Sequence, residues 1–185
     1  MTLVFDPDLD MFSARPDLII TTANCVGVAH THTTRALAKR FPLAARRFVQ
    51  LCGRHLDCEG RPDERFSGRS GSEIPPCLVS ETPCKTHRMR PGIAGLTKTD
   101  TAGPDWLAHM PTRLHWRDSA DIEMLDLALE NLARRLSGQT KRYLIHIPEM
   151  DAAESDPPWR DVQPLLEYHL GGAACQKHDI RCHRP

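Results

Sequence analysis

The stretch DLIITTANCVGV, residues 17–28, decides the fold that the sequence predicts. Its apolar residues 18–20 follow one another without the polar alternation of a strand that has one face in water. We therefore expect a strand that is buried on both faces, as in the centre of a parallel sheet.

A helical pattern follows this strand. Apolar residues from Leu37 to Phe48 recur at helical spacing, and Thr33 or Thr34 is positioned to cap the start of the helix. Pro42 is expected to divide the pattern into two helices, because proline cannot extend the helix that precedes it.

Strand-like and helix-like segments alternate along the rest of the chain, which predicts an α/β protein with a three-layer α/β/α sandwich around a mixed central sheet. Residues 87–105 have no regular pattern and are expected to be irregular. We expect one domain over residues 1–170, an exposed insertion at 53–73 and a C-terminal tail at 171–185. The remaining strands are expected within 3–12, 75–82, 106–116 and 141–150, and the helices within 119–138, from a Ser119 cap to Gly138, and 157–170.

The overall charge is balanced, with 24 basic and 24 acidic residues among 185, so it argues neither for nor against nucleic acid. No apolar run reaches the roughly 18 residues of a membrane span, and the N-terminus lacks an export signal. These features predict a cytoplasmic protein without a membrane partner.

The chain has seven cysteines, and two clusters of cysteine and histidine raise the alternative of a zinc site. Neither has the tight pair of cysteines that is typical of structural zinc, so we expect small buried or surface thiols and no cofactor. The clusters are Cys52, Cys58, Cys77 and Cys84 with His55 or His87, and Cys175, His178, Cys182 and His183.

Three blocks of sequence resemble the macrodomains, a family that binds ADP-ribose. The blocks are DLIITTANCVGV…ALAKRFP, WLAHMPTRLHWRDSADIEMLDLAL and IHIPEMDAAESDPPWRDVQPLL, and they occur in the family's order. They are most similar to the branch of antitoxins that remove ADP-ribose from DNA. The resemblance implies a macrodomain-like fold and ADP-ribose or a related nucleotide as the ligand.

The resemblance also implies roles for single residues. Asp10 falls at the position of an aspartate that contacts adenine, and Asn24 at that of an asparagine beside the distal ribose. The alternatives are that Asp10 caps a turn and that Asn24 satisfies the backbone of its loop. The ligand-binding residues expected in this way are Asp10, Met11, Asn24, Gly27, Val28, Thr31, Thr33, Met150 and Ala152.

Both glycine-rich loops of the family have lost their glycines in this chain. Residues 29–32 read AHTH, so side chains stand where backbone N–H groups approach a diphosphate in the family. The second loop, residues 150–156, carries three acids, and each carboxylate about 4 Å from a phosphate costs on the order of 4 kcal/mol before screening. A diphosphate held in the family's usual way is therefore disfavoured.

The catalytic pattern also departs from the resemblance, because Arg113 stands where this branch has a lysine. Arginine stays protonated and cannot act as a nucleophile, although it can pair with a phosphate or carboxylate. We therefore predict a divergent module that binds ADP-ribose or a related nucleotide and has lost the hydrolase activity.

Three alternatives remain open. One is an active ADP-ribosyl or phosphoester hydrolase with a remodelled site. A variant of it places a metal between His30 and His32 and carboxylates such as Glu149, Asp151 or Glu154, with His109, His115 and His146 near the sheet ends. The others are a protein-interaction or immunity module of antitoxin-like character, and nucleic-acid binding through the basic stretches 35–47 and 85–90. The catalytic candidates are His30, His32, Arg113 and Asp151.

Overall fold

A computed structural model describes residues 3–52, 94–99, 103–148, 150 and 157–183. Within these ranges, six strands form one mixed sheet in the order β1-β6-β5-β2-β4-β3. All neighbouring strands are parallel except β3, which pairs antiparallel with β4. The strands are β1 (Val4–Asp6), β2 (Leu18–Asn24), β3 (Gly95–Lys98), β4 (Trp106–Arg113), β5 (Leu144–Ile147) and β6 (Asp179–His183).

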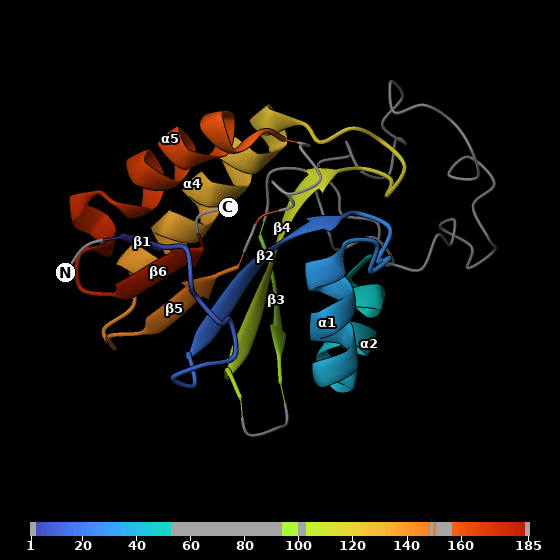
Figure 1. Ribbon diagram of the computed structural model, residues 1–185, viewed down its shortest axis with the longest axis horizontal. Helices are drawn as coiled ribbons and strands as arrows, with labels where there is room; N and C mark the ends of the chain where they lie inside the picture. The colour runs from blue at the N-terminus through green and yellow to red at the C-terminus, as the bar shows by residue number, and fades with distance from the viewer. Residues whose placement is uncertain (1–2, 53–93, 100–102, 149, 151–156, 184–185) are drawn as a thin grey trace.

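Helices cover both faces of this sheet. Figure 1 shows α4 and α5 together on one face and α1 and α2 together on the other. This arrangement confirms the predicted three-layer sandwich. The helices are α1 (His32–Arg40), α2 (Pro42–Cys52), α4 (Ile122–Ser137) and α5 (Trp159–Leu170), followed by the short 3-10 helix η4 (Ala173–Cys175).

Strand β2 lies in the middle of the sheet and is buried along its whole length, as predicted. Leu18 and Ile20 point into the core that contains α4 and α5, whereas Ile19 packs with Leu37 and Phe41 on the opposite face. Alternate side chains of a strand leave on opposite faces, so three consecutive apolar residues serve two cores. Each fully buried isoleucine contributes about 2–3 kcal/mol of hydrophobic stabilisation.

The helical stretch after β2 divides at Pro42, as predicted, with α1 ending at Arg40 and α2 beginning at the proline. The predicted cap of α1 was wrong, because Thr31 is the N-cap residue. Thr31 Oγ1 accepts from Thr34 N at 3.1 Å, and Thr31 N donates to Thr34 Oγ1 at 3.0 Å. Thr34 therefore completes a reciprocal capping box, and Thr33 is buried.

Helix α4 ends at Gly138 as predicted, but Asp121 and not Ser119 caps its start. The Asp121 carboxylate accepts from the backbone N–H groups of Glu123 and Met124, at 2.8 and 3.3 Å. Asp121 N donates to Thr112 O at 2.6 Å, so a contact with β4 fixes the residue at which the helix begins.

Two short strands correct the sequence-based expectations. The stretch 87–105 was expected to be irregular, yet its residues 95–98 form β3. Residues 179–183, placed in a tail, form β6 between β1 and β5, with Ile180 and Cys182 in the core. Both strands owe their structure to pairing with a neighbour, which local patterns do not reveal. The insertion at 53–73 and the strand expected at 75–82 lie outside the described residues.

Within the described residues, the C-terminal cysteine–histidine cluster does not have the arrangement of a metal site. His178 is buried, and its Nδ1 accepts from Tyr143 N at 3.2 Å while its Nε2 donates to Leu136 O at 3.1 Å. Burial raises the pKa of the Cys182 thiol to about 12. Of the other cluster, only Cys52 is described, and it is buried.

Among the described residues, no helix combines the length and the apolar character that crossing a bilayer requires.

Replacing Asp121 by alanine should lower the free energy of unfolding by about 1 kcal/mol, because two N–H groups of the first turn of α4 lose their acceptor. Denaturant titration followed by circular dichroism measures this. Ser119→Ala is the matched control and should change stability by less than about 0.5 kcal/mol. A larger loss of stability for Ser119→Ala than for Asp121→Ala would contradict the assignment of Asp121 as the cap.

Candidate ligand-binding site

The sheet has a topological switch point between β2 and β5. The chain leaves β2 toward α1 on one face of the sheet and leaves β5 toward α5 on the opposite face (Figure 1). Open α/β sheets bind ligands outside the carboxyl ends of the strands at such a point, and we refer to this region as the crevice. The loop at residues 25–31 begins there, directly after β2.

The side chain of Asn24 organises the loop at residues 25–31. Asn24 is completely buried at the end of β2. Its Oδ1 accepts from the backbone N–H groups of Val26 and Val28, at 3.2 and 3.1 Å, and its Nδ2 donates to Val28 O at 2.7 Å. The Asn24 side chain therefore satisfies the backbone of its own loop, which is the alternative given for it in the sequence analysis. Val28, also predicted to bind ligand, has both backbone groups bonded to Asn24.

His30 lies against Asn24. The two N–H groups bonded to Asn24 Oδ1 leave Nδ2 to face His30 Nδ1, at 3.1 Å. An amide nitrogen donates, so His30 Nδ1 is the acceptor of this contact, and Val28 O lies 3.5 Å from the same ring nitrogen. His30 is half-buried, whereas His32, at the first position of α1, is exposed.

Gly27 permits the turn of this loop. Its φ is +78°, a conformation that side chains rarely adopt. A Cβ at this position would lie 3.1 Å from Val49 Cα and 3.3 Å from Cys52 Cβ. The absence of a side chain at Gly27 therefore lets the predicted ligand loop pack closely against α2.

Arg113 is held inside the turn that follows β4. The residue is only 7% exposed, and its Nη1 donates to Asp118 O at 3.2 Å. The Asp118 carboxylate accepts from His115 N at 2.9 Å and so closes the same turn. The sequence reading missed Asp118, although an acid three residues after His115 is a common turn signal.

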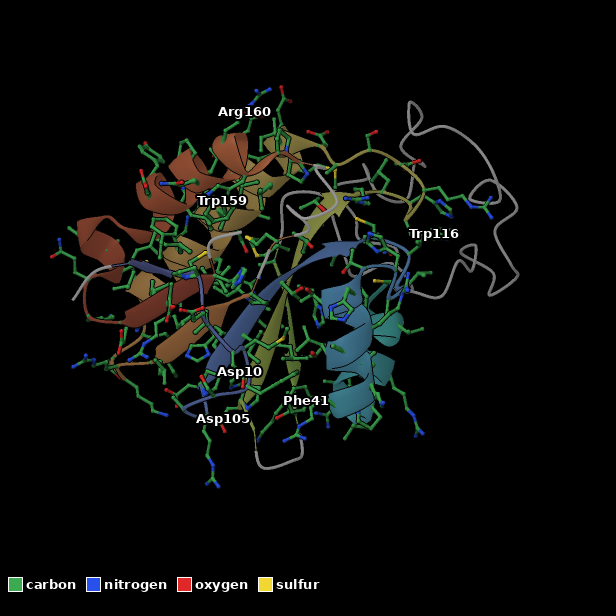
Figure 2. All side chains as sticks on the ribbon, in the orientation of Figure 1. Asp10, Phe41, Asp105, Trp116, Trp159 and Arg160 are labelled. Atoms are coloured by element: carbon green, nitrogen blue, oxygen red, sulfur yellow. The ribbon has the colours of Figure 1, made fainter. Side chains whose placement is uncertain are left out.

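Asp10 and Met11 lie far from Asn24. The Asp10 carboxylate accepts from Phe12 N at 2.9 Å, so it caps a turn as its alternative reading states. Met11 O lies 3.3 Å from His146 Nδ1, and His146 pairs with Ile19 near the amino end of β2. Ile19 and Asn24 are five positions apart, about 17 Å along a strand. Figure 2 likewise shows Asp10 at a distance from Trp116, which follows β4.

Met150 is the described member of the second predicted loop. It is 1% exposed, and its side chain belongs to the core with α4 and α5. Asp151 and Ala152 lie outside the described residues, as do Glu149 and Glu154, so the predicted pairing of these carboxylates with His30 and His32 stays a prediction. Within the described ranges, no group of three or more histidine, cysteine or acidic residues has the arrangement of a metal site.

The remaining histidines of the metal alternative have structural partners. His109 stacks on Phe48 with ring centroids 4.3 Å apart, and its Nε2 lies 2.9 Å from Thr97 Oγ1. Burial lowers the pKa of His109 to about 3, so the ring is neutral at physiological pH. Burial also lowers the pKa of His146. His115 Nδ1 accepts from Arg117 N at 3.3 Å.

Comparison with solved structures identifies similar folds. The macrodomain of Mycobacterium tuberculosis DarG has a TM-score of 0.72 and 17% identity, covering 100% of this chain and 98% of that chain. The macrodomain of Thermus aquaticus DarG has a TM-score of 0.72 and 18% identity, covering 100% and 99%. Thermosipho africanus DarTG in complex with ADP-ribose has a TM-score of 0.70 and 16% identity, covering 100% of this chain and 42% of that chain.

Comparison with protein-family models gives no match, and comparison with curated proteins gives none either. The likeness to the solved structures establishes the fold at these low identities. The chain has the macrodomain fold and resembles the DarG macrodomains over its whole length, which confirms the prediction made from its three sequence blocks.

Replacing Asn24 by alanine should lower the free energy of unfolding by about 3 kcal/mol, because Val26 N and both backbone groups of Val28 lose their partner in a buried place. Urea titration of the purified protein measures the change. The exposed His32→Ala is the control, with less than about 0.5 kcal/mol expected. An effect of Asn24→Ala as small as that of the control would show that the loop does not depend on this side chain.

The stability of the protein should fall in acid because of His109. Above pH 6.5 the ring is neutral in both the folded and the unfolded chain. As the pH falls from 6.5 toward 3, the unfolded ring takes up a proton while the folded ring stays neutral, so the unfolded state is favoured. The loss is on the order of 4 kcal/mol over this window. Urea midpoints at several pH values should show a flatter dependence for His109→Gln than for the wild type, and equal slopes would contradict the assignment.

Proposed function

We propose that this chain is a divergent macrodomain module that binds ADP-ribose or a related nucleotide in the crevice between β2 and β5, and that it lacks ADP-ribosyl hydrolase activity. The observation that carries the proposal is the switch point at this crevice. It supports a ligand site by geometry alone, and a protein with the same fold, Thermosipho africanus DarTG, was solved in complex with ADP-ribose.

The diphosphate is expected to contribute less to binding than in a glycine-rich loop. The N–H groups of Val26 and Val28 are bonded to Asn24, and Thr34 N is bonded to Thr31 Oγ1. Backbone donors that already have partners are not available to an anion at the start of α1. We therefore propose that contacts to the sugar and the base provide most of the affinity.

The loss of hydrolase activity is supported by the state of Arg113. Its guanidinium is buried and donates to Asp118 O, and arginine does not lose its proton to become a nucleophile. The alternative hydrolase with His30, His32, Arg113 and Asp151 has weaker support, because His30 Nδ1 accepts from Asn24 and His32 is exposed. We also propose a cytoplasmic location and a nucleic-acid or protein partner.

Isothermal titration calorimetry with ADP-ribose tests this function, with a matched pair of glycine variants. Wild type should release heat and unfold at a higher temperature with the ligand. Gly27→Ala should weaken binding about tenfold, because an alanine at positive φ is strained by about 1–2 kcal/mol and moves the loop. Gly138→Ala, at φ −74°, should bind as the wild type does, because an added Cβ would meet only ordinary contacts at 3.8 Å or more.

Two outcomes would contradict the proposal separately. Neither heat nor a thermal shift at millimolar ADP-ribose would exclude this ligand. Release of ADP-ribose from an ADP-ribosylated oligonucleotide by the wild type, but not by Arg113→Gln, would show that the hydrolase activity is present.

A further inference from the structure

A hollow lies between helices α1 and α2 and the sheet. We call it the α1–α2 cavity, and its main lining residues are Leu37, Ala38, Ala45, Phe48, Leu107 and His109. Its volume is about 280 Å³, equal to roughly nine water molecules at about 30 Å³ each. This is close to the lower limit of small-molecule sites.

The interior of the α1–α2 cavity suits an apolar, flat group. Phe48 and His109 line it, and their rings stack on each other 15° from parallel. Three polar side chains of the lining are already bonded: His109 Nε2 to Thr97, the Thr34 hydroxyl within the capping box, and the Thr21 hydroxyl to Thr22 O. A polar ligand body would lose its hydrogen bonds with water here and gain none.

Arg46 gives the exposed rim of the cavity a positive charge. It lines the cavity and is exposed to solvent. No described carboxylate forms an ion pair with it, and residues 18–52 contain neither aspartate nor glutamate. A carboxylate that reaches this rim would pair with the guanidinium without competition from an acidic neighbour in that stretch.

We propose that the α1–α2 cavity binds a small aromatic carboxylate, with one ring against Phe48 and His109 and the carboxylate paired with Arg46. The volume admits one ring with a short substituent. The inference does not rest on the proposed function, because the aromatic rings and the charge that it uses belong to α2 and β4; Gly27 and Ala29 of the loop at residues 25–31 also line the cavity.

Calorimetry and ligand-observed NMR with benzoate test the proposal, with benzyl alcohol as an uncharged probe of the same shape. Benzoate should bind more tightly than benzyl alcohol. Arg46→Gln should weaken benzoate about fivefold and leave benzyl alcohol unchanged, as expected for one exposed ion pair. Arg134→Gln, which removes an exposed arginine of α4, is the matched control. It should leave the affinities for benzoate and for benzyl alcohol unchanged.

Filling the space gives a second, independent measurement. Ala45→Phe places a ring between α2 and the sheet and should abolish binding of both probes. Ala38→Leu fills the cavity from α1 and should do the same if Ala45→Phe proves too unstable to fold. Saturating ADP-ribose should not displace benzoate.

Each of the following results would overturn the proposal. The first is that benzoate does not bind up to its solubility limit, the second that it binds equally to a folded filled variant, and the third that it binds equally to Arg46→Gln and wild type. Displacement of benzoate by ADP-ribose would place both ligands in one site, while loss of ADP-ribose binding alone would contradict only the proposed function.

Discussion

The side chain of Asn24 uses all of its hydrogen-bonding capacity on the loop that follows β2, and the candidate site depends on this commitment. Its oxygen accepts from two backbone N–H groups, and its nitrogen faces Val28 O and His30 Nδ1. One buried amide thereby fixes the loop without a ligand. A loop ordered in advance loses little conformational entropy on binding, but its bonded N–H groups cannot turn toward a phosphate.

Much of the fold could be predicted because its strongest signals are local. Three consecutive apolar residues at 18–20 indicate a strand buried on both faces, and Pro42 separates two helices by its own chemistry. The errors share a cause in tertiary contacts. Asp121 caps α4, and not Ser119, because its N–H bonds to β4, and β3 and β6 exist as strands because neighbours pair with them.

The hydrogen-bond partners of the candidate site residues could not be predicted from the sequence. The sequence placed one predicted ligand loop directly after β2, yet the type of a residue does not reveal its partner. Asn24 and Arg113 were expected to face a ligand, and both are bonded to backbone groups of the protein instead. Asp118 was overlooked because its function is to close a turn. Polar residues beside a crevice thus have two possible uses, and only their geometry distinguishes them.

The loop at residues 25–31 also separates the two hollows, since Gly27 and Ala29 line the α1–α2 cavity. Two sites that share a wall influence each other only when the wall has two arrangements that the ligands favour differently. The hydrogen bonds of Asn24 and the packing of Gly27 against Val49 specify one arrangement. We therefore expect ligands of the crevice and of the α1–α2 cavity to bind independently, because the shared loop has one arrangement.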